Sequence, residues 1–391
     1  MGEIGLALSI ASGVIWLYLL GLRGQFWRCD RQLEQEELAK QGIQEPLPSV
    51  CAVIPARNEA DLLPVSLRSL LNQDYPGEFQ VILVDDHSTD GTAQVARQTA
   101  DDLGKLDQLQ VVAAAPLPAG WTGKLWAMHQ GVQVAQTQNP DYILLTDADI
   151  EHDASNLRRL VTKARQEQRD LVSVMVRLRC ASPWERLLIP AFVFFFQKLY
   201  PFRWVSDPSQ ATAAAAGGCI VIRREVLETI GGIAVIRQAL IDDCALAQVV
   251  KAHNPAGVWL GLSDRTISLR PYSSLNSIWD MVARSAYTQL NYSPLLLVGT
   301  VIGMALVYLV PPLAFLYGIL ASNSAIALLG LLTWGLISLA YLPTIRFYRC
   351  PLILAIALPG IAFLYLLMTI DSALRHWQGR GGSWKGRVYE R

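Results

Sequence analysis

The sequence predicts an α/β domain built on a mostly parallel central sheet, with transmembrane helices at the N- and C-terminal ends of the chain. Short apolar runs alternate with helix-like patterns through the middle of the chain, and this alternation builds parallel sheets covered by helices. Nearly charge-free stretches of bilayer-spanning length lie near both ends. The 391 residues include 33 basic and 33 acidic side chains, so the net charge gives no reason to expect a nucleic-acid partner.

The first apolar stretch covers residues 4–22, which are enough to span a bilayer and lack the basic flank of a cleaved signal peptide. Beyond Tyr292 the chain again becomes nearly charge-free, in blocks separated by polar or proline breaks. The predicted organisation is a transmembrane anchor at 1–24, a charged linker at 25–45, the α/β domain at 46–290, a C-terminal membrane region of two to three hydrophobic segments at 291–372 and a basic tail at 373–391.

Basic residues next to the first span set the expected orientation. Arg23, Arg28 and Arg31 follow that span and no basic residue precedes it, so the α/β domain should face the cytoplasm from an integral protein of the inner or plasma membrane. The six cysteines show no metal or redox spacing, which agrees with a reducing compartment. Three full C-terminal crossings would put the basic tail on the wrong side, so one of three blocks should be re-entrant, interfacial or fused with its neighbour: 294–321, 324–345 or 351–370.

The middle of the chain reads as strand-helix-strand units. Val50–Ile54, Val81–Val84 and residues 142–146 are short apolar runs typical of buried parallel strands. Leucines at helical spacing within residues 59–71 predict the first connecting helix. Ligands of such sheets bind beyond the carboxyl ends of the strands, which singles out the polar residues found there: Arg57, Asn58, Glu59, Asp85, Asp86, Asp147 and Asp149.

Asp147 and Asp149 are separated by one residue directly after an apolar strand. Residues i and i+2 of an extended chain point the same way, so both carboxylates can face one ligand. Such oxygen ligands suit Mg²⁺ or Mn²⁺, whose shells are completed by water and diphosphate oxygens. The alternative is that the aspartates serve a turn or a helix N-cap. The sequence has neither the dinucleotide-binding glycine fingerprint nor a phosphate loop, which disfavours dehydrogenases and kinases.

Five segments occur in one order along the chain: residues 53–59, residues 84–92, Gly123-Lys124 through Gly131, Asp147-Ala148-Asp149, and residues 241–247. With these segments the sequence resembles the inverting glycosyltransferases of family 2, which have the nucleotide-binding GT-A fold. The flanking membrane segments are similar to those of the lipid-modifying branch. Within that branch, the chain most resembles the glycosyltransferases associated with hopanoid biosynthesis and, more distantly, ceramide glucosyltransferase.

This resemblance implies roles for individual residues. Asp243 would act as the general base, and Asp242 stands where the family has a glutamate. Asp149 and Asp147 would hold the divalent metal, Mg²⁺ or Mn²⁺, with Asp149 as the stronger candidate. On the residues alone, helix N-capping is the alternative role for Asp242 and Asp243. A larger set would contact the nucleotide-sugar donor: Pro55, Ala56, Arg57, Glu59, Asp85, Asp86, Lys124 and Asp147.

Further residues resemble the family's acceptor side. Gly218 and Cys219 end a small-residue segment that the family places near its acceptor, although a tight turn before a strand explains the glycine as well. Arg284 is a partial match to an acceptor-side motif. Residues 184–205 predict an interfacial helix that brings the site to the bilayer, with a core helix as the alternative.

The basic tail contains a motif with Trp384 and Arg387 that resembles the tail of ceramide glucosyltransferase. By that resemblance the tail would reach the donor diphosphate. The plainer alternative is a basic tail that binds lipid headgroups.

The predicted function is transfer of one sugar, with inversion, from a nucleotide sugar to a membrane lipid at the cytoplasmic face. A UDP-sugar is the expected donor, and a hopanoid or another glycolipid precursor is the expected acceptor. Two alternatives stay open: transfer to a polyprenyl phosphate, and a non-catalytic membrane scaffold or sensor with the GT-A fold. A transporter is disfavoured because the hydrophobic blocks lack internal charged residues.

Overall fold

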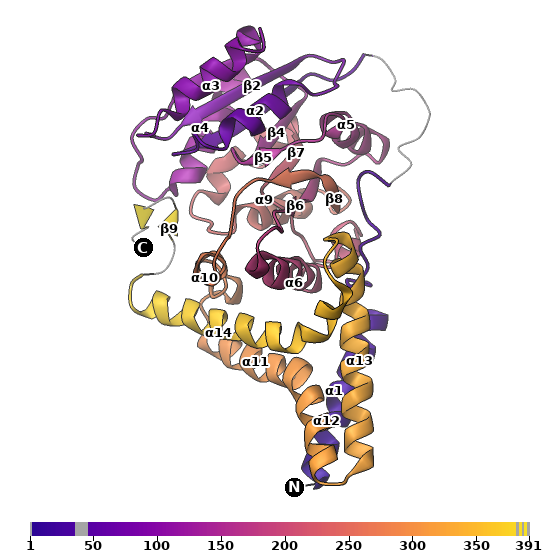
Figure 1. Cartoon of the computed structure of the whole chain (residues 1–391). Coiled ribbons are helices and arrows are strands. Elements are labelled where there is room, and N and C mark those ends of the chain that lie inside the picture. The colour runs from indigo at the N-terminus through magenta and orange to yellow at the C-terminus, as the bar shows by residue number, and fades with distance from the viewer. Residues whose placement is uncertain (1, 36–45, 381–382, 385–386, 389–391) are drawn as a thin grey trace. The chain divides into compact units, whose positions relative to one another are not determined.

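The computed structural model describes residues 2–35, 46–380, 383, 384, 387 and 388. The chain divides into two compact units (Figure 1). The sheet unit comprises Asp30–Arg179, Phe202–Pro271 and Trp384–Arg391. The helical unit comprises Met1–Cys29, Cys180–Pro201 and Tyr272–Ser383.

One sheet organises the sheet unit, with the strand order β3-β2-β1-β4-β7-β6-β8-β5. Parallel pairs join β3 to β2, β2 to β1, β1 to β4 and β6 to β8. β7 is antiparallel to β4 and β6, and β5 is antiparallel to β8. The predicted α/β architecture with a mostly parallel sheet is confirmed. The strands are β1 (Val50–Ala56), β2 (Phe79–Asp85), β3 (Leu109–Ala113), β4 (Tyr142–Thr146), β5 (Ile150–Glu151), β6 (Leu171–Leu178), β7 (Cys219–Arg223) and β8 (Val258–Ser268).

The apolar runs of the sequence become the central strands. Every residue of β1 and of β4 is buried. Strands of a parallel sheet are covered on both faces, so they carry continuous apolar runs without alternation. The helices of this unit are α2 (Leu63–Leu71), α3 (Thr92–Asp101), α4 (Gly123–Thr137), α5 (Asn156–Gln166), α7 (Phe202–Val205), α8 (Arg224–Thr229) and α9 (Asp242–His253), with short helical turns η1 (Leu106–Gln108) and η2 (Gly232–Ile236).

Gly131 lets α4 lie directly on the sheet. A Cβ atom at this position would stand 2.5 Å from Cγ1 of Val53 in β1 and 2.9 Å from Cγ2 of Val84 in β2. Both neighbours are buried, β-branched side chains with little freedom to move. The glycine therefore sets the distance between α4 and the two strands whose ends carry the predicted donor-binding residues.

The helical unit contains the apolar segments of both chain ends. Among the residues that the structure describes, four segments are long and apolar enough to cross a membrane: Gly2–Leu22, Pro294–Leu320, Ser324–Phe347 and Leu352–Trp377. The predicted apolar helices at both ends are thus confirmed. The elements of this unit are α1 (Gly2–Leu22), α6 (Pro183–Leu199), α10 (Leu275–Ala283), η3 (Thr288–Leu290), α11 (Pro294–Met304), η4 (Ala305–Leu309), α12 (Val310–Leu320), α13 (Ser324–Phe347), η5 (Leu352–Ala357) and α14 (Leu358–Trp377).

α6 covers most of the segment 184–205 for which an interfacial helix is predicted. It begins at a capping box in which the Ser182 hydroxyl accepts from the Glu185 N–H. Its aromatic residues pack inside the helical unit, with ring centroids 5.2 Å apart for Phe194 and Tyr341 and 5.0 Å apart for Phe195 and Tyr365. The helix ends at Leu199, and its place at a membrane interface stays a prediction.

The tail forms a short two-stranded pairing of β9 (Ser383–Trp384) with β10 (Arg387–Val388). The side chains of Trp384 and Arg387 lie outside the described part of the chain. Their predicted approach to a diphosphate therefore stays a prediction.

Replacing Gly131 by valine should destabilise the sheet unit, because the new side chain overlaps Val53 and Val84. Overpacking of this kind costs about 1–3 kcal/mol. We expect a lower apparent Tm in a thermal denaturation of the detergent-solubilised protein. Gln133→Ala, at an exposed position of the same helix, is the matched control and should leave Tm nearly unchanged. Equal Tm values for the two variants would contradict the close approach.

Candidate functional site

The predicted donor-binding residues gather where β1, β2 and β4 end. β1 lies between the other two strands, and Ala56 at its end is aligned with Asp85 at the end of β2. Asp147 follows β4 directly. Since neighbouring parallel strands end at the same edge of a sheet, the topology brings these segments together at the place where such sheets bind ligands.

Lys124 is the charged centre of this edge. It lies in the first turn of α4, whose N-cap hydroxyl, that of Thr122, accepts from the Leu125 N–H at 3.4 Å. The ammonium Nζ lies 3.0 Å from Oδ1 of Asp147 and 3.1 Å from Oδ2 of Asp242. One cation thus joins the turn after β4 to the first turn of α9.

Asp243 is held by two backbone donors. Its Oδ2 accepts from the Gly217 N–H at 2.8 Å, and its Oδ1 accepts from the Cys244 N–H at 2.7 Å. Asp242 and Asp243 are the first two residues of α9. An N-cap residue precedes the helix, and at α9 this residue is Ile241. The structure brings Lys124, Asp147, Asp242 and Asp243 together as one cluster.

Burial and mutual charge shift the pKa values of this cluster. Burial raises the pKa of Asp243 to about 6, and the neighbouring carboxylate of Asp242 adds to the rise. Burial also raises the pKa of Asp147, against the opposing effect of Lys124. Burial disfavours the charge on Lys124, but the carboxylates of Asp147 and Asp242 outweigh it, so the pKa of Lys124 is raised and the side chain stays cationic.

Gly217 belongs to this cluster although the sequence analysis did not select it. A Cβ atom there would lie 3.4 Å from Oδ2 of Asp243 and 3.5 Å from Nζ of Lys124. The adjacent Gly218 directly precedes β7, which begins at Cys219, and the Gly218 carbonyl accepts from the Thr146 hydroxyl at 2.8 Å. The small residues of this segment thus let the backbone approach the charged cluster.

Arg270 forms a second cluster that the sequence analysis missed. Its Nε donates to Oδ2 of Asp149 at 2.8 Å, and its Nη2 donates to Oε1 of Glu59 at 2.6 Å. Both carboxylate side chains are only 8% exposed. No local sequence pattern indicates this contact, because Arg270 lies 121 residues from Asp149 and 211 residues from Glu59 in the chain.

Asp85 and Asp86 take different positions. Asp86 is buried, and both its carbonyl and its carboxylate face Arg57, whose Nη1 donates to the carbonyl at 2.6 Å. Asp85 is partly exposed and accepts from the Ser88 N–H at 3.1 Å. Asp90 accepts from the N–H of Thr92, the first residue of α3, at 3.0 Å.

Arg284 and Cys219 are two of the predicted acceptor-side positions. Arg284 is exposed and is the residue that follows α10, in the helical unit. Cys219 is buried in the sheet unit, where its sulfur accepts from the Asn156 amide at 3.5 Å. Their contribution to an acceptor site stays a prediction.

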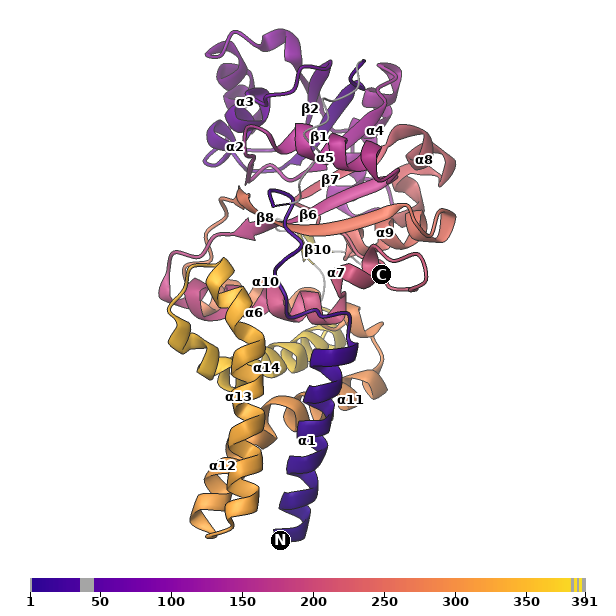
Figure 2. The same cartoon turned by 90° about the vertical axis from the view of Figure 1, so that its right-hand side faces the viewer.

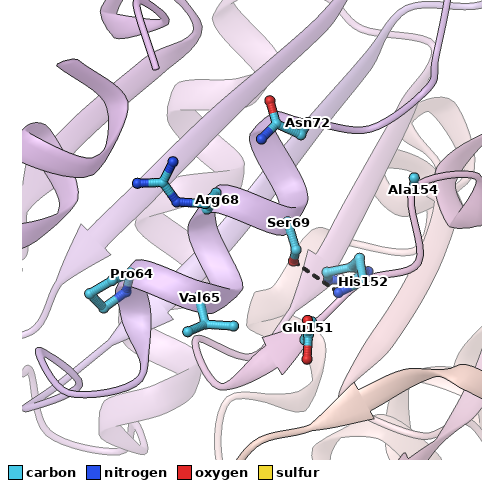
Figure 3. A pocket seen from close by; sticks show the side chains of 8 residues that line it. All are labelled: Pro64, Val65, Arg68, Ser69, Asn72, Glu151, His152 and Ala154. Carbon is cyan, nitrogen blue, oxygen red and sulfur yellow. Dashed lines mark hydrogen bonds between the residues drawn. The ribbon is translucent and has the colours of Figure 1, made fainter. Parts of the chain in front are cut away.

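A separate hollow of about 360 Å³ lies beside α2, lined by Pro64, Val65, Arg68, Ser69, Asn72, Glu151, His152 and Ala154 (Figure 3). The Ser69 hydroxyl in this hollow accepts from the His152 N–H at 2.9 Å. The His152 ring is buried between Thr146 and Asn156, and burial lowers its pKa to about 4. None of the residues predicted for donor, metal or base lines this hollow.

Comparison with known proteins shows what this domain resembles. Residues 51–231 match the family profile described as glycosyl transferase family 2. A mannosyltransferase from Pyrobaculum calidifontis, solved with GDP-Man and Mn²⁺, superposes with a TM-score of 0.54 over 95% of this chain and 99% of its own, at 18% identity. The predicted GT-A fold is confirmed by these two matches, and residues 51–231 are similar to family 2 glycosyltransferases.

Three curated relatives are similar to parts of the chain. They are "Probable glycosyltransferase YdaM" of Bacillus subtilis, 27% identical over 52% of this chain and 45% of the relative; a beta-monoglucosyldiacylglycerol synthase of Synechocystis, 35% identical over 30% and 23%; and an undecaprenyl-phosphate 4-deoxy-4-formamido-L-arabinose transferase of Pseudomonas savastanoi, 28% identical over 36% and 40%. The chain thus spans less than half the length of each of these relatives.

Replacing Arg270 by alanine should destabilise the sheet unit, because the buried carboxylates of Glu59 and Asp149 would lose the guanidinium group that pairs with them. Breaking such a pair costs on the order of 3–5 kcal/mol, and we expect the lower end because Arg270 is 31% exposed. The measurement is the apparent Tm of the purified protein. Adding Glu59→Gln and Asp149→Asn to the same chain should recover part of the loss, whereas the exposed Arg97→Ala control should shift Tm little. No recovery would contradict a charge-based role for Arg270.

Proposed function

We propose, on the premise that residues 51–231 form a family 2 glycosyltransferase domain with the GT-A fold, that this chain transfers a sugar from a nucleotide sugar to a membrane lipid hydroxyl. The observation that carries the proposal is the cluster of Lys124, Asp147, Asp242 and Asp243 at the carboxyl edge of the sheet. It provides a cation for a departing diphosphate and a carboxylate for the acceptor proton.

Asp243 is proposed as the general base. A lipid hydroxyl is a weak nucleophile near neutral pH, and a carboxylate that accepts its proton during attack contributes about 10²–10⁴-fold to the rate. The hydroxyl oxygen forms a bond to the anomeric carbon while the bond from that carbon to the diphosphate oxygen breaks. The electron pair leaves with the nucleotide diphosphate, and attack from the opposite side inverts the anomeric centre.

The two clusters favour a cation that arrives with the donor. Glu59, Asp147, Asp149, Asp242 and Asp243 supply five carboxylates, against the two cations Lys124 and Arg270. A nucleotide diphosphate is itself an anion, so its entry requires more positive charge than the side chains provide.

Asp147 and Asp149 are proposed as the protein ligands of a divalent metal. The described residues contain no group of three or more metal-ligating side chains. Two carboxylates nevertheless fit Mg²⁺ or Mn²⁺, which commonly bind one or two carboxylates and keep waters and substrate phosphates as the other ligands. Such a metal, when bound, would neutralise charge on the departing diphosphate, the role that Lys124 shares from the protein side.

The donor and acceptor classes are narrower proposals. A UDP-sugar is proposed from the resemblance to the hopanoid-associated and ceramide enzymes, while the structural relative was solved with GDP-Man, so the donor panel should contain both nucleotides. A lipid acceptor is supported by four membrane-length helices and by a relative named for glucosyldiacylglycerol synthesis. A hopanoid is the specific acceptor that the first resemblance suggests.

Polyprenyl phosphate is the second candidate acceptor, favoured by the relative named for transfer to undecaprenyl phosphate. The two acceptors differ in what they require from Asp243. A phosphate oxygen is already ionised near neutral pH, so it can attack without giving up a proton. A hydroxyl acceptor therefore depends on the base much more strongly than a phosphate acceptor does.

The proposal is tested with the full chain in lipid bilayers, a panel of UDP- and GDP-sugars, and diacylglycerol, hopanoid or polyprenyl phosphate as acceptor. We expect product with one lipid hydroxyl, loss of product on chelation and its return with Mn²⁺. Asp243→Asn should reduce the rate about 10²–10⁴-fold, while Asp107→Asn, an exposed site outside the clusters, should not. Product on polyprenyl phosphate with little effect of Asp243→Asn would favour the second candidate, and no product on any acceptor would favour the scaffold alternative.

The raised pKa of Asp243 predicts the pH profile. The base works only when it is deprotonated, so with a pKa of about 6 the rate should be constant well above that pH and should fall about tenfold per unit below it. A carboxyl with the ordinary pKa of 3.8 would keep its full rate down to about pH 5. The measurement is kcat against pH with saturating donor. An acid limb near pH 4 would contradict the proposed environment of the base.

A further inference from the structure

Three helices of the helical unit run side by side. A Cβ atom on Gly5 of α1 would lie 3.4 Å from Ile326 of α13, and one on Gly13 would lie 3.3 Å from Thr333. The residue numbers of the contacting positions increase together in the two helices, so α1 and α13 run in the same direction. α12 runs the other way, since Gly318 faces Ala327 while Gly330 faces Phe315. The ends of α1 and α13 therefore lie at the same end of this three-helix bundle.

α14 lies across this bundle rather than along it (Figures 1 and 2). Two polar side chains tie it to α6 and to the end of α10. The Tyr365 hydroxyl donates to the Leu188 carbonyl of α6 at 2.9 Å. The Ser372 hydroxyl donates to the Ala283 carbonyl at the end of α10 at 2.5 Å.

Charged contacts hold the last turns of α14 to α10 as well. Asp371 accepts from the Trp279 indole at 2.7 Å, and Arg375 pairs with Asp280 at 2.6 Å. From Tyr365 to Arg375, the helix thus stays attached to one layer formed by α6 and α10. A helix that crossed a bilayer would move away from this layer and could contact it only near one end.

The opposite face of α14 is apolar and uncovered. Phe363, Leu374 and Trp377 are 45%, 44% and 56% exposed. Leu367 and Ile370, which are partly exposed, complete a stripe at spacings of three and four residues, so all five lie on one face. An apolar face of this length beside membrane-length helices fits the acyl boundary of a lipid layer.

Charge separates the two ends of the bundle. Arg23 follows α1, and Arg346 and Arg349 lie at the end of α13. The other end carries Glu3 and the uncharged turn between α12 and α13 at Ser322. The positive-inside rule assigns the Arg-rich end to the cytoplasmic side. If α14 crossed the membrane, its own Arg375 and the following Arg380 would lie on the opposite side from Arg23.

We propose that α14 lies in the plane of the bilayer, at the headgroup boundary of the side where α1 and α13 end, with its Phe363–Trp377 stripe against the acyl chains. The chain then crosses the membrane three times, through α1, through η4 together with α12, and through α13, and the tail lies on the same side of the membrane as residue 30. This inference rests on the proposed insertion of the chain in a membrane. It explains how a basic tail can follow three C-terminal apolar segments.

Depth measurements along α14 test the proposal. Phe363, Leu367, Ile370 and Leu374 are each replaced by p-acetylphenylalanine carrying a nitroxide, which leaves the native cysteines untouched, in full-length protein in phosphatidylcholine–phosphatidylglycerol bilayers. Power saturation with oxygen and a nickel chelate then gives the depth of each label. We expect one common depth, about 5–10 Å below the headgroups. A crossing helix would instead spread positions 363 and 374 over about 16 Å.

Leu328 and Leu339 of α13 provide the matched control, because both are exposed and are also eleven residues apart. Their labels should differ in depth by about 16 Å, as expected of a crossing helix. A depth gradient along α14 equal to that of α13 would overturn the proposal. If the α13 labels show no contact with lipid, membrane insertion itself fails, and the inference falls with it. Sugar transfer is not needed for either measurement, so loss of the proposed activity would leave this test intact.

The side of the tail gives a second measurement. Green fluorescent protein, which fluoresces only in the cytoplasm, or alkaline phosphatase, which is active only outside, is fused after Arg391 or inserted at Ser322. We expect a fluorescent fusion at Arg391 and an active phosphatase at Ser322. An active phosphatase at both positions would mean that α14 crosses the membrane.

Discussion

The ammonium group of Lys124 lies between two carboxylates, Asp147 and Asp242, and this contact joins parts of the sheet unit that are distant in the chain. The first turn of α4, the turn after β4 and the first turn of α9 all meet at it. The Lys124 side chain is 19% exposed, and a charge that is largely shielded from water is costly unless it is paired, so this contact favours the relative position of the three segments. The position of Asp243 follows, because it is the next residue of α9.

The turn at Ala148 and Asp149 divides the two carboxylates of the Asp147-Ala148-Asp149 motif between different cations. The Ala148 carbonyl accepts from the Ser66 hydroxyl at 2.6 Å, which fixes the turn against α2. Asp147 then faces Lys124 while Asp149 faces Arg270. The motif is thus held by charges of the protein on both sides. A metal bound there would share its ligands with these side chains, which links metal affinity to the ionic contacts of the fold.

Local pattern predicts the central strands and the edge at which the site forms, because apolar runs such as Val50–Ile54 bury as parallel strands and end at polar residues. Pairing over long distances is not visible in such patterns. Arg270 has no signal that would relate it to Glu59, since the contact depends on how β8 leads back to the sheet edge. Sequence patterns do not indicate the role of Gly217 for another reason. Its backbone N–H donates to Asp243, and its lack of a side chain leaves room for that contact.

Composition also cannot give the direction in which an apolar segment runs. Pro294–Leu320 reads as one continuous span of 27 residues, yet it contains the π-helical turn η4 at Ala305–Leu309 and the pair Pro311-Pro312. Both features bend helices, because each interrupts the regular ladder of backbone hydrogen bonds. α11 therefore leaves the direction of α12 within one apolar segment (Figure 1). Apolar composition measures affinity for lipid, whereas packing partners and helix breaks decide whether a segment crosses the bilayer or lies along it.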